Sequence, residues 1–407
     1  MARCRQEGGA MPTRNEHARE FVTLDGMRGV AALAVVVVHT PLLFGSLALQ
    51  YEYPCFPDRT LVCHGFVGPL YEGPLAVDFF FALSGFVLAH AYEEKMKRGM
   101  SAMRFMLIRL IRLYPLYLVG LLLGAILALR QAQRGEYILN EVISTISFGI
   151  LFLPTPTAFS FDHVLYPLNI PAWSLFFELA ANAVYGLIGR HLTTRRLTIL
   201  VLCAALILVA YGLAFSARGL GGEGVEWRWF VGGVTRVLFS FFAGILVYRV
   251  WSQSSYRPKL PTWVFPAILL ISFGIIVSAS MRPVYELCFI LIVSPLLIYG
   301  AAGNNPKGSS LRLVYSSFGV ASYAIYTIHY PLYHILERGL LHWRREMPSV
   351  NPMWGIVFLA AVFSMALFLD RFYDVKIRRW LSRISFSKSP VTARTSDPPP
   401  TRSEETM

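Results

Sequence analysis

Charged side chains are scarce in this 407-residue chain: they make up 15% of its residues, whereas 55% are hydrophobic. A soluble domain of this length needs a polar surface that such a composition does not supply, and the mean hydropathy of +0.51 points the same way. The shortage of charge therefore excludes an ordinary soluble protein. It predicts an all-α fold, a polytopic helical bundle embedded in a membrane.

Several common catalytic motifs are also absent. The chain has no P-loop, no glycine-rich dinucleotide turn after a strand, no zinc-protease helix motif and no Gly-x-Ser-x-Gly elbow. Serine-nucleophile chemistry thus has little support, and we expect neither a metal ion nor a tightly bound cofactor. Cysteine is rare too, with five in all, and only Cys55 and Cys63 lie close enough in one loop for a disulfide to be a reasonable alternative to two free thiols.

Eleven apolar windows are candidate membrane helices, and the distribution of positive charge indicates which of them cross. If window 138–153 does not cross, 27 of the 37 Lys and Arg residues fall on the same side as both termini. We therefore predict about ten crossings, cytoplasmic termini, and a re-entrant or interfacial segment at 138–153 that is buried in protein or lines a cavity. The windows are residues 30–49, 75–92, 105–129, 138–153, 172–189, 197–216, 229–248, 262–281, 284–301, 316–337 and 352–372.

The two ends of the chain differ from its apolar middle. The first 29 residues hold arginines but no apolar stretch ending in a cleavage site, so we expect no removable signal peptide. The tail from about residue 385 is rich in Ser, Thr and Pro, which predicts disorder. The sequence thus predicts a cytoplasmic segment (1–20), a transmembrane domain (21–375) and a tail (376–407) that is basic and then disordered.

The net charge of +13 follows from this topology. Positive side chains gather on the predicted cytoplasmic side, where anionic membrane lipid attracts them. We therefore expect membrane lipid as a partner and no nucleic acid.

One histidine and one arginine are placed at a helical spacing in the first apolar stretch. His39 lies inside window 30–49, and Arg28 precedes it by eleven residues. On an α-helix eleven steps return to nearly the same face, which puts the two side chains about 16 Å apart. Ionisable groups in a membrane helix usually mark a pathway or a site, although a snorkelling arginine beside a hydrogen-bonded histidine is an equal alternative.

A second pair of arginines precedes the third apolar run. Arg109 and Arg112, in RLIRLYP, are three residues apart and so share a helical face among large apolar side chains. Ordinary cytoplasmic anchoring explains nearby Lys95 and Arg104 fully, but it explains these two less well, because desolvating them without an anion is costly. Since guanidinium groups bind phosphate bidentately, we expect a phosphorylated cytoplasmic ligand here.

Two carboxylates, Asp78 and Glu178, lie at membrane depth in the second and fifth windows. Each could pair with a buried arginine, Arg28 or Arg236, or could orient His39 by accepting its second ring proton. The alternatives are equally supported, and Glu178 joins His39 and Arg28 as a candidate catalytic residue. His329, in YTIHYPLY, receives no role from the sequence beyond a hydrogen-bonded bundle residue.

Five stretches, taken in order, resemble the membrane acyltransferase family 3. The first, LDGMRGVAALAVVVVHT (24–40), is similar to the family's opening helix, with an Arg, ten intervening residues and a His. The others are VDFFFALSGFVLAHAY (77–92), RLIRLYPLYLVG (109–120), PAWSLFFELAANAVYG (171–186) and SYAIYTIHYPLY (322–333).

The resemblance implies transfer of an acyl group, commonly acetyl, from cytoplasmic acyl-CoA to a hydroxyl of an extracytoplasmic glycan, lipid-linked sugar or related acceptor, at a bacterial inner membrane. The family's Arg-x10-His pair maps on Arg28 and His39, and its Arg-x-x-Arg pair maps on Arg109 and Arg112. In this reading His39 is the general base, and Arg109 and Arg112 hold the phosphates of the donor. Two rival classes stay open, a transporter or flippase and a non-catalytic membrane scaffold.

Overall fold

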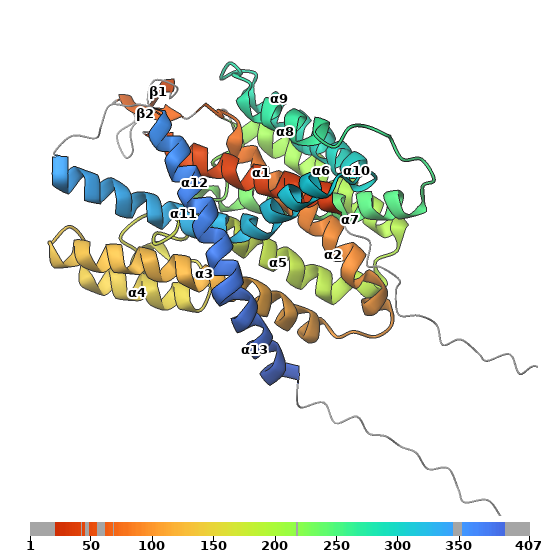
Figure 1. Cartoon of the computed structure of the whole chain (residues 1–407), viewed down its shortest axis with the longest axis horizontal. Coiled ribbons are helices and arrows are strands. Elements are labelled where there is room, and N and C mark those ends of the chain that lie inside the picture. The colour runs from red at the N-terminus through yellow and green to blue at the C-terminus, as the bar shows by residue number, and fades with distance from the viewer. Residues whose placement is uncertain are drawn as a thin grey trace, which may run out of the picture.

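The computed structural model describes residues 21–41, 43–44, 49–54, 62–67, 69–216, 219–344 and 352–386, and most of this part is helical. Every one of the eleven apolar windows corresponds to helix (Figure 1). The helices are α1 (Val22–His39), α2 (Ala76–Lys97), α3 (Ala102–Gln133), α4 (Leu139–Ile150), α5 (Ala172–Ile188), α6 (Thr194–Phe215), α7 (Phe230–Gln253), α8 (Val264–Gly274), α9 (Arg282–Cys288), α10 (Ser294–Ala302), α11 (Ser309–Arg344), α12 (Met353–Leu369) and α13 (Val375–Phe386), with π-helical turns η6 (Phe289–Val293) and η7 (Asp370–Asp374) joining α9 to α10 and α12 to α13.

Eight described helical runs are long and apolar enough to cross a membrane, which makes the protein an all-α polytopic membrane protein. Ten crossings would need two more helices, α11 and α8, so that number stays a prediction. The 36-residue α11 is long enough, at about 1.5 Å per residue. The short α8 runs beside the α9–α10 span: the amide of Leu260, before α8, bonds Asn304 at one end of that span. At the other end the carbonyl of Phe273 accepts from Glu72, which is paired with Arg282.

Helix α4 supports the predicted re-entrant segment. Its 12 residues extend only about 18 Å, too short for a bilayer core of about 30 Å. It lies alongside the second half of α3 (Figure 1), and its C-terminal end reaches the middle of α3, where the hydroxyls of Tyr114 and Tyr117 donate to the carbonyls of Ile150 and Gly149. The chain then returns, and the amide of Leu165 donates to the carbonyl of Val225 in the α6–α7 loop.

Small residues set the distances between the central helices. α2 crosses α7 so closely that a Cβ at Gly244 would lie 1.9 Å from the carbonyl oxygen of Ala82. α1 also approaches α11 closely, since a Cβ at Gly29 would lie 2.6 Å from the carbonyl oxygen of Phe318. In membranes such small-residue contacts let helix backbones approach and pack. The contacts fix α1 against α11 and α2 against α7, and these four helices position the site.

The first predicted window was misplaced. Helix α1 covers Val22–His39 instead of residues 30–49, so Arg28 lies within the helix and His39 is its last residue. The cause is local, because Pro41 disfavours helical backbone at Thr40 and the chain turns there. The imidazole therefore stands at a helix end, whereas the sequence placed it midway along an apolar segment.

Two further differences concern the regions that flank the helices. A short antiparallel hairpin, β1 (Leu49–Pro54) and β2 (Val62–Val67), pairs Leu49 with Val67 in the loop after α1. Cys55 lies outside the described residues, so the disulfide stays a prediction. At the other end α12 continues through η7 into α13, and the predicted boundary at residue 375 falls inside a continuous helical run that ends at Phe386. The predicted disordered part beyond it and residues 1–20 are outside the described chain.

Candidate active site

A cavity of about 400 Å³ lies between α1, α2, α3, α5 and α11 and collects four of the five predicted site residues: Arg28, Arg109, Arg112 and Glu178. Its lining extends along α2 from Val77 to Tyr92, a distance of about 22 Å by helical rise. The arginines of α3 come at the start of that helix, and the lining continues along it to the apolar Leu116. The cavity is thus long, with cationic groups toward one end and apolar walls toward the other.

Arg109 is the buried member of the arginine pair and is already partnered. Its Nη2 donates to Oε1 of Glu178 at 3.0 Å, and the same oxygen accepts from the hydroxyl of Ser84 at 2.6 Å. The Nε of Arg109 is buried and has no hydrogen-bond partner in the described part of the chain. A buried donor without a partner is unusual, and here it lies on a cavity wall, where a bound acceptor could satisfy it.

Arg112 and Arg28 are the more accessible cations of this cavity. Arg112 is exposed and has no ion-pair partner within the described ranges, and it experiences the charges of Arg109 and Arg28. Arg28 bonds the hydroxyl of Ser322 at 2.9 Å and the carbonyl of Gly319 at 2.8 Å, both in α11, and it forms an ion pair with Asp25 at 3.0 Å. Four arginines and three carboxylates line this space, so a positive charge is in excess and an anionic ligand would complement it.

Sequence reasoning missed three charged residues that line the same cavity. The π-helical turn η7 presents Asp370 and Asp374, and both pair with Arg378 of α13, at 3.5 and 2.8 Å. The charge count had assigned Arg378 to the basic tail, because the residue follows the end of the last apolar window at residue 372. Only the continuation of the last span as α13 brings it back to the bundle.

His39 has an imidazole partner that the sequence did not assign. The Nε2 of His329 lies 3.3 Å from Nδ1 of His39, and the ring centroids are 5.1 Å apart. Each Nδ1 also faces a carbonyl oxygen one turn back in its own helix: that of Val35 at 2.8 Å for His39 and that of Ile325 at 3.0 Å for His329. His329 is fully buried, whereas His39 is partly exposed. Their spacing of 290 residues left no signal in the sequence.

One aromatic residue separates the imidazole pair from the cavity. Tyr326 lines the cavity and precedes His329 by one helical turn, with 6.1 Å between the ring centroids. Its hydroxyl bonds Ser174 at 2.6 Å, and its ring meets Phe80 edge-on at 5.7 Å. His39 is therefore not among the residues that line the cavity. Tyr326 lies between the cavity and the imidazole pair, so a substrate group in the cavity would have to pass Tyr326 to reach His39.

The two carboxylates have partners other than His39. Asp78 forms a doubly bonded ion pair with Arg236, at 2.6 and 3.1 Å, and both side chains are completely buried. Glu178 bonds Arg109 and Ser84 as described. The hypothesis that either carboxylate orients His39 is thus wrong. Both pair with a buried arginine instead: Asp78 with Arg236, as the sequence suggested, and Glu178 with Arg109, which the sequence did not suggest as its partner.

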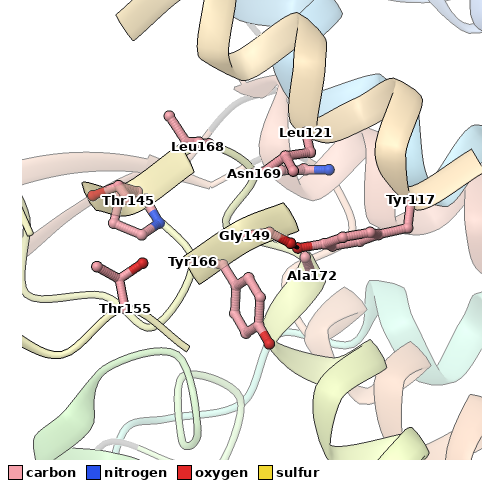
Figure 2. A pocket seen from close by; sticks show the side chains of 10 residues that line it. Tyr117, Leu121, Thr145, Gly149, Thr155, Tyr166, Leu168, Asn169 and Ala172 are labelled. Carbon is pink, nitrogen blue, oxygen red and sulfur yellow. Dashed lines mark hydrogen bonds between the residues drawn. The ribbon is translucent and has the colours of Figure 1, made fainter. Parts of the chain in front are cut away.

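Polar residues of the loop before α5 are divided between the surface and a small enclosed space. Asp162 and His163 are exposed, but Asn169 is buried and donates to the carbonyl of Thr327 at 2.8 Å. Figure 2 shows Asn169 with Tyr117 and others around a cavity of about 10 Å³. That volume suits roughly one water molecule and is too small for a substrate group, so Asn169 ties the loop to α11.

Comparison with known proteins agrees with this geometry. A family model described as an acyltransferase domain matches residues 21–370, nearly the whole helical bundle and every residue of the site except Asp374 and Arg378. The chain therefore belongs to this family of acyltransferases, and it is a membrane-embedded enzyme of that class.

Two curated relatives extend the comparison. The chain is 27% identical to "Acyltransferase MdmB" of Streptomyces mycarofaciens over 349 residues, which are 81% of this chain and 84% of that protein. It is 36% identical to "Protein 2 in picA locus" of Rhizobium radiobacter over 207 residues, 48% of this chain and 96% of that one. No solved structure matches.

Proposed function

We propose that this acyltransferase is an O-acyltransferase that takes its acyl group, commonly acetyl, from cytoplasmic acyl-CoA and transfers it to a hydroxyl of an extracytoplasmic glycan, lipid-linked sugar or related acceptor. The observation that carries the proposal is the elongated cavity with Arg28, Arg109 and Arg112 in its wall. Coenzyme A has matching chemistry, because it joins a polyanionic phosphate end to a long, thin arm that ends in the thioester.

The positive-inside pattern supports a cytoplasmic donor. Arg109 and Arg112 belong to the arginine- and lysine-rich stretch around the start of α3, the side on which most basic residues fall. Phosphates at Arg112 would meet an accessible guanidinium without a counterion, and they could also accept from the unpartnered Nε of Arg109. The arm would then extend past Leu116 toward Tyr326.

The acceptor has a separate approach, at the end of α1. His39 is the last residue of that helix and is partly exposed, and the ring of Tyr330 stands edge-on to it at 5.7 Å. Beyond Tyr330 the same face of α11 carries His334, whose Nδ1 bonds Glu337 at 2.8 Å. Aromatic, imidazole and carboxylate groups in a row suit a hydroxyl-rich acceptor, which offers donors, acceptors and apolar faces.

The reaction is an acyl transfer with one proton relay. The acceptor O–H gives its proton to Nε2 of His39 while the oxygen attacks the thioester carbonyl carbon. The C–S bond breaks, and the leaving thiolate takes the proton from Nε2 of His39, which gives the ester and free CoA–SH and returns His39 to its neutral form. Arg28 supports the anionic donor at the cavity wall, and Glu178 holds Arg109 in place for it.

The test is mass spectrometry of surface glycans and lipids from cells with and without the gene for this chain. The proposal expects an acyl increment that disappears with the protein and returns with the wild type but not with His39→Ala. Acyl groups that persist unchanged in the deletion strain would contradict it. A transporter, the alternative class, would change the amount of a substrate in one compartment and leave its mass unaltered.

A further inference from the structure

We propose that His329 is a positioning residue for His39: its Nε2 accepts a hydrogen bond from Nδ1–H of His39, which holds the ring in place and stabilises it when Nε2 of His39 takes a proton. The inference rests on the proposed role of His39 as the base. The contact that carries it is the 3.3 Å distance between Nε2 of His329 and Nδ1 of His39.

Backbone carbonyls fix which nitrogen of each ring carries hydrogen. A carbonyl oxygen can only accept, so Nδ1 of His39, 2.8 Å from the oxygen of Val35, is protonated in the neutral ring. By the same reasoning Nδ1 of His329 is protonated, because it lies 3.0 Å from the oxygen of Ile325. The Nε2 of His329 is then an acceptor, and the Nδ1–H of His39 is shared between it and Val35.

This arrangement prepares His39 to receive a proton. In neutral imidazole with hydrogen on Nδ1 the basic lone pair is on Nε2. When that nitrogen becomes protonated, the hydrogen bond from Nδ1–H to His329 becomes charge-assisted, and such bonds are roughly twice as strong as neutral ones. Because this hydrogen bond to His329 strengthens only as charge develops on His39, it lowers the activation barrier of acyl transfer and does little for substrate binding.

His329 cannot take the place of the base. Its side chain is fully buried, and both ring nitrogens are engaged, by Ile325 and by His39. Its position is rigid, since α1 and α11 touch through backbone at Gly29 and Phe318, and Arg28 bonds α11 at Ser322. It therefore acts through His39.

Reactivity of His39 toward diethylpyrocarbonate tests the inference without any acceptor. This reagent acylates the free nitrogen of neutral imidazole, and peptide mass spectrometry of the full-length protein in proteoliposomes reports the rate at His39. We expect His329→Leu to slow modification of His39 about 10-fold to 100-fold. His329→Gln keeps an acceptor oxygen toward His39 and should restore most of the rate. The exposed His191, whose modification should be unchanged in both variants, is the internal control.

The same variants are then compared in transfer of label from [14C]acetyl-CoA to native membranes. The inference expects His329→Leu to lower kcat by a similar factor with KM for acetyl-CoA unchanged, and His329→Gln to recover. Equal rates for His329→Leu and wild type would overturn the inference. It would also be overturned if His329→Gln unfolded at the wild-type temperature yet reacted as slowly as His329→Leu. Full transfer activity in His39→Ala would refute the proposed base, and the reagent assay would still decide whether the two rings are coupled.

Discussion

Arg112 offers the cleanest test of donor binding, because it faces the cavity without a partner among the described residues. Truncation to Ala removes one charge-assisted contact to a phosphate, worth about 1.5 to 3 kcal/mol. At about 1.4 kcal/mol per tenfold, the apparent KM for acetyl-CoA should rise roughly 10-fold to 150-fold. Folding should be little affected, since an exposed arginine without an ion-pair partner contributes little to stability.

The neighbouring Arg109 is a poorer choice for that experiment. Arg109 is buried and bonds Glu178 at 3.0 Å, so Arg109→Ala leaves a partly buried carboxylate without its cation, which costs up to about 3 kcal/mol of stability. A loss of activity in that variant would therefore mix unfolding with weaker binding.

The assay for Arg112→Ala is transfer of label from [14C]acetyl-CoA at several donor concentrations, with the unfolding temperature of each protein measured alongside. Arg195→Ala is the matched control, because Arg195 is an exposed arginine at the start of α6 that is not among the cavity-lining residues. Raised salt should weaken donor binding in the wild type more than in Arg112→Ala. An unchanged KM in Arg112→Ala would refute the phosphate assignment.

Three predictions concern the scaffold, each measured by thermal unfolding of the purified protein. Asp78→Asn should cost about 3 to 5 kcal/mol by leaving buried Arg236 uncompensated, and replacing Arg236 with Met in the same protein should restore most of the loss. Gly244→Ala should cost about 1 to 3 kcal/mol or more because its Cβ meets backbone, whereas Gly308→Ala, with open space around it, should be neutral. Burial raises the pKa of the Glu223 carboxyl, so wild-type stability should fall as the pH rises through that pKa, and Glu223→Gln should make the fall smaller.

The sequence predicted the arrangement of the fold well because its two main signals are strong. Apolar windows located every described helix that is long enough to cross a membrane, and the positive-inside count predicts that α4, which is short, does not cross. Helix ends were predicted less well. Hydropathy alone extended the first window to residue 49, although Pro41 ends α1 at His39, and it placed the end of the last window at residue 372, although the helical run continues to Phe386.

The site was predictable where its residues follow one another in a helix. Arg109 with Arg112, and Arg28 with His39, stand at helical spacings that the sequence shows directly, and the structure places both arginines of the first pair and Arg28 around one cavity. Contacts between distant helices carry no such signal. His329 meets His39 across 290 residues, which a single sequence does not reveal. The role of Asp78 stayed open for the same reason, because nothing in the sequence chooses Arg236 as its partner.

The most direct measurement is acyl transfer by the purified chain in proteoliposomes, supplied with [14C]acetyl-CoA and lipid extract from native membranes, for wild type and His39→Ala. A positioned base contributes about 10² to 10⁴ in rate, so His39→Ala should lose transfer by at least about 100-fold. The His39→Ala protein should unfold at the wild-type temperature, and acetyl-CoA should still raise that temperature as it does for the wild type. Transfer by His39→Ala at the wild-type rate would contradict the account.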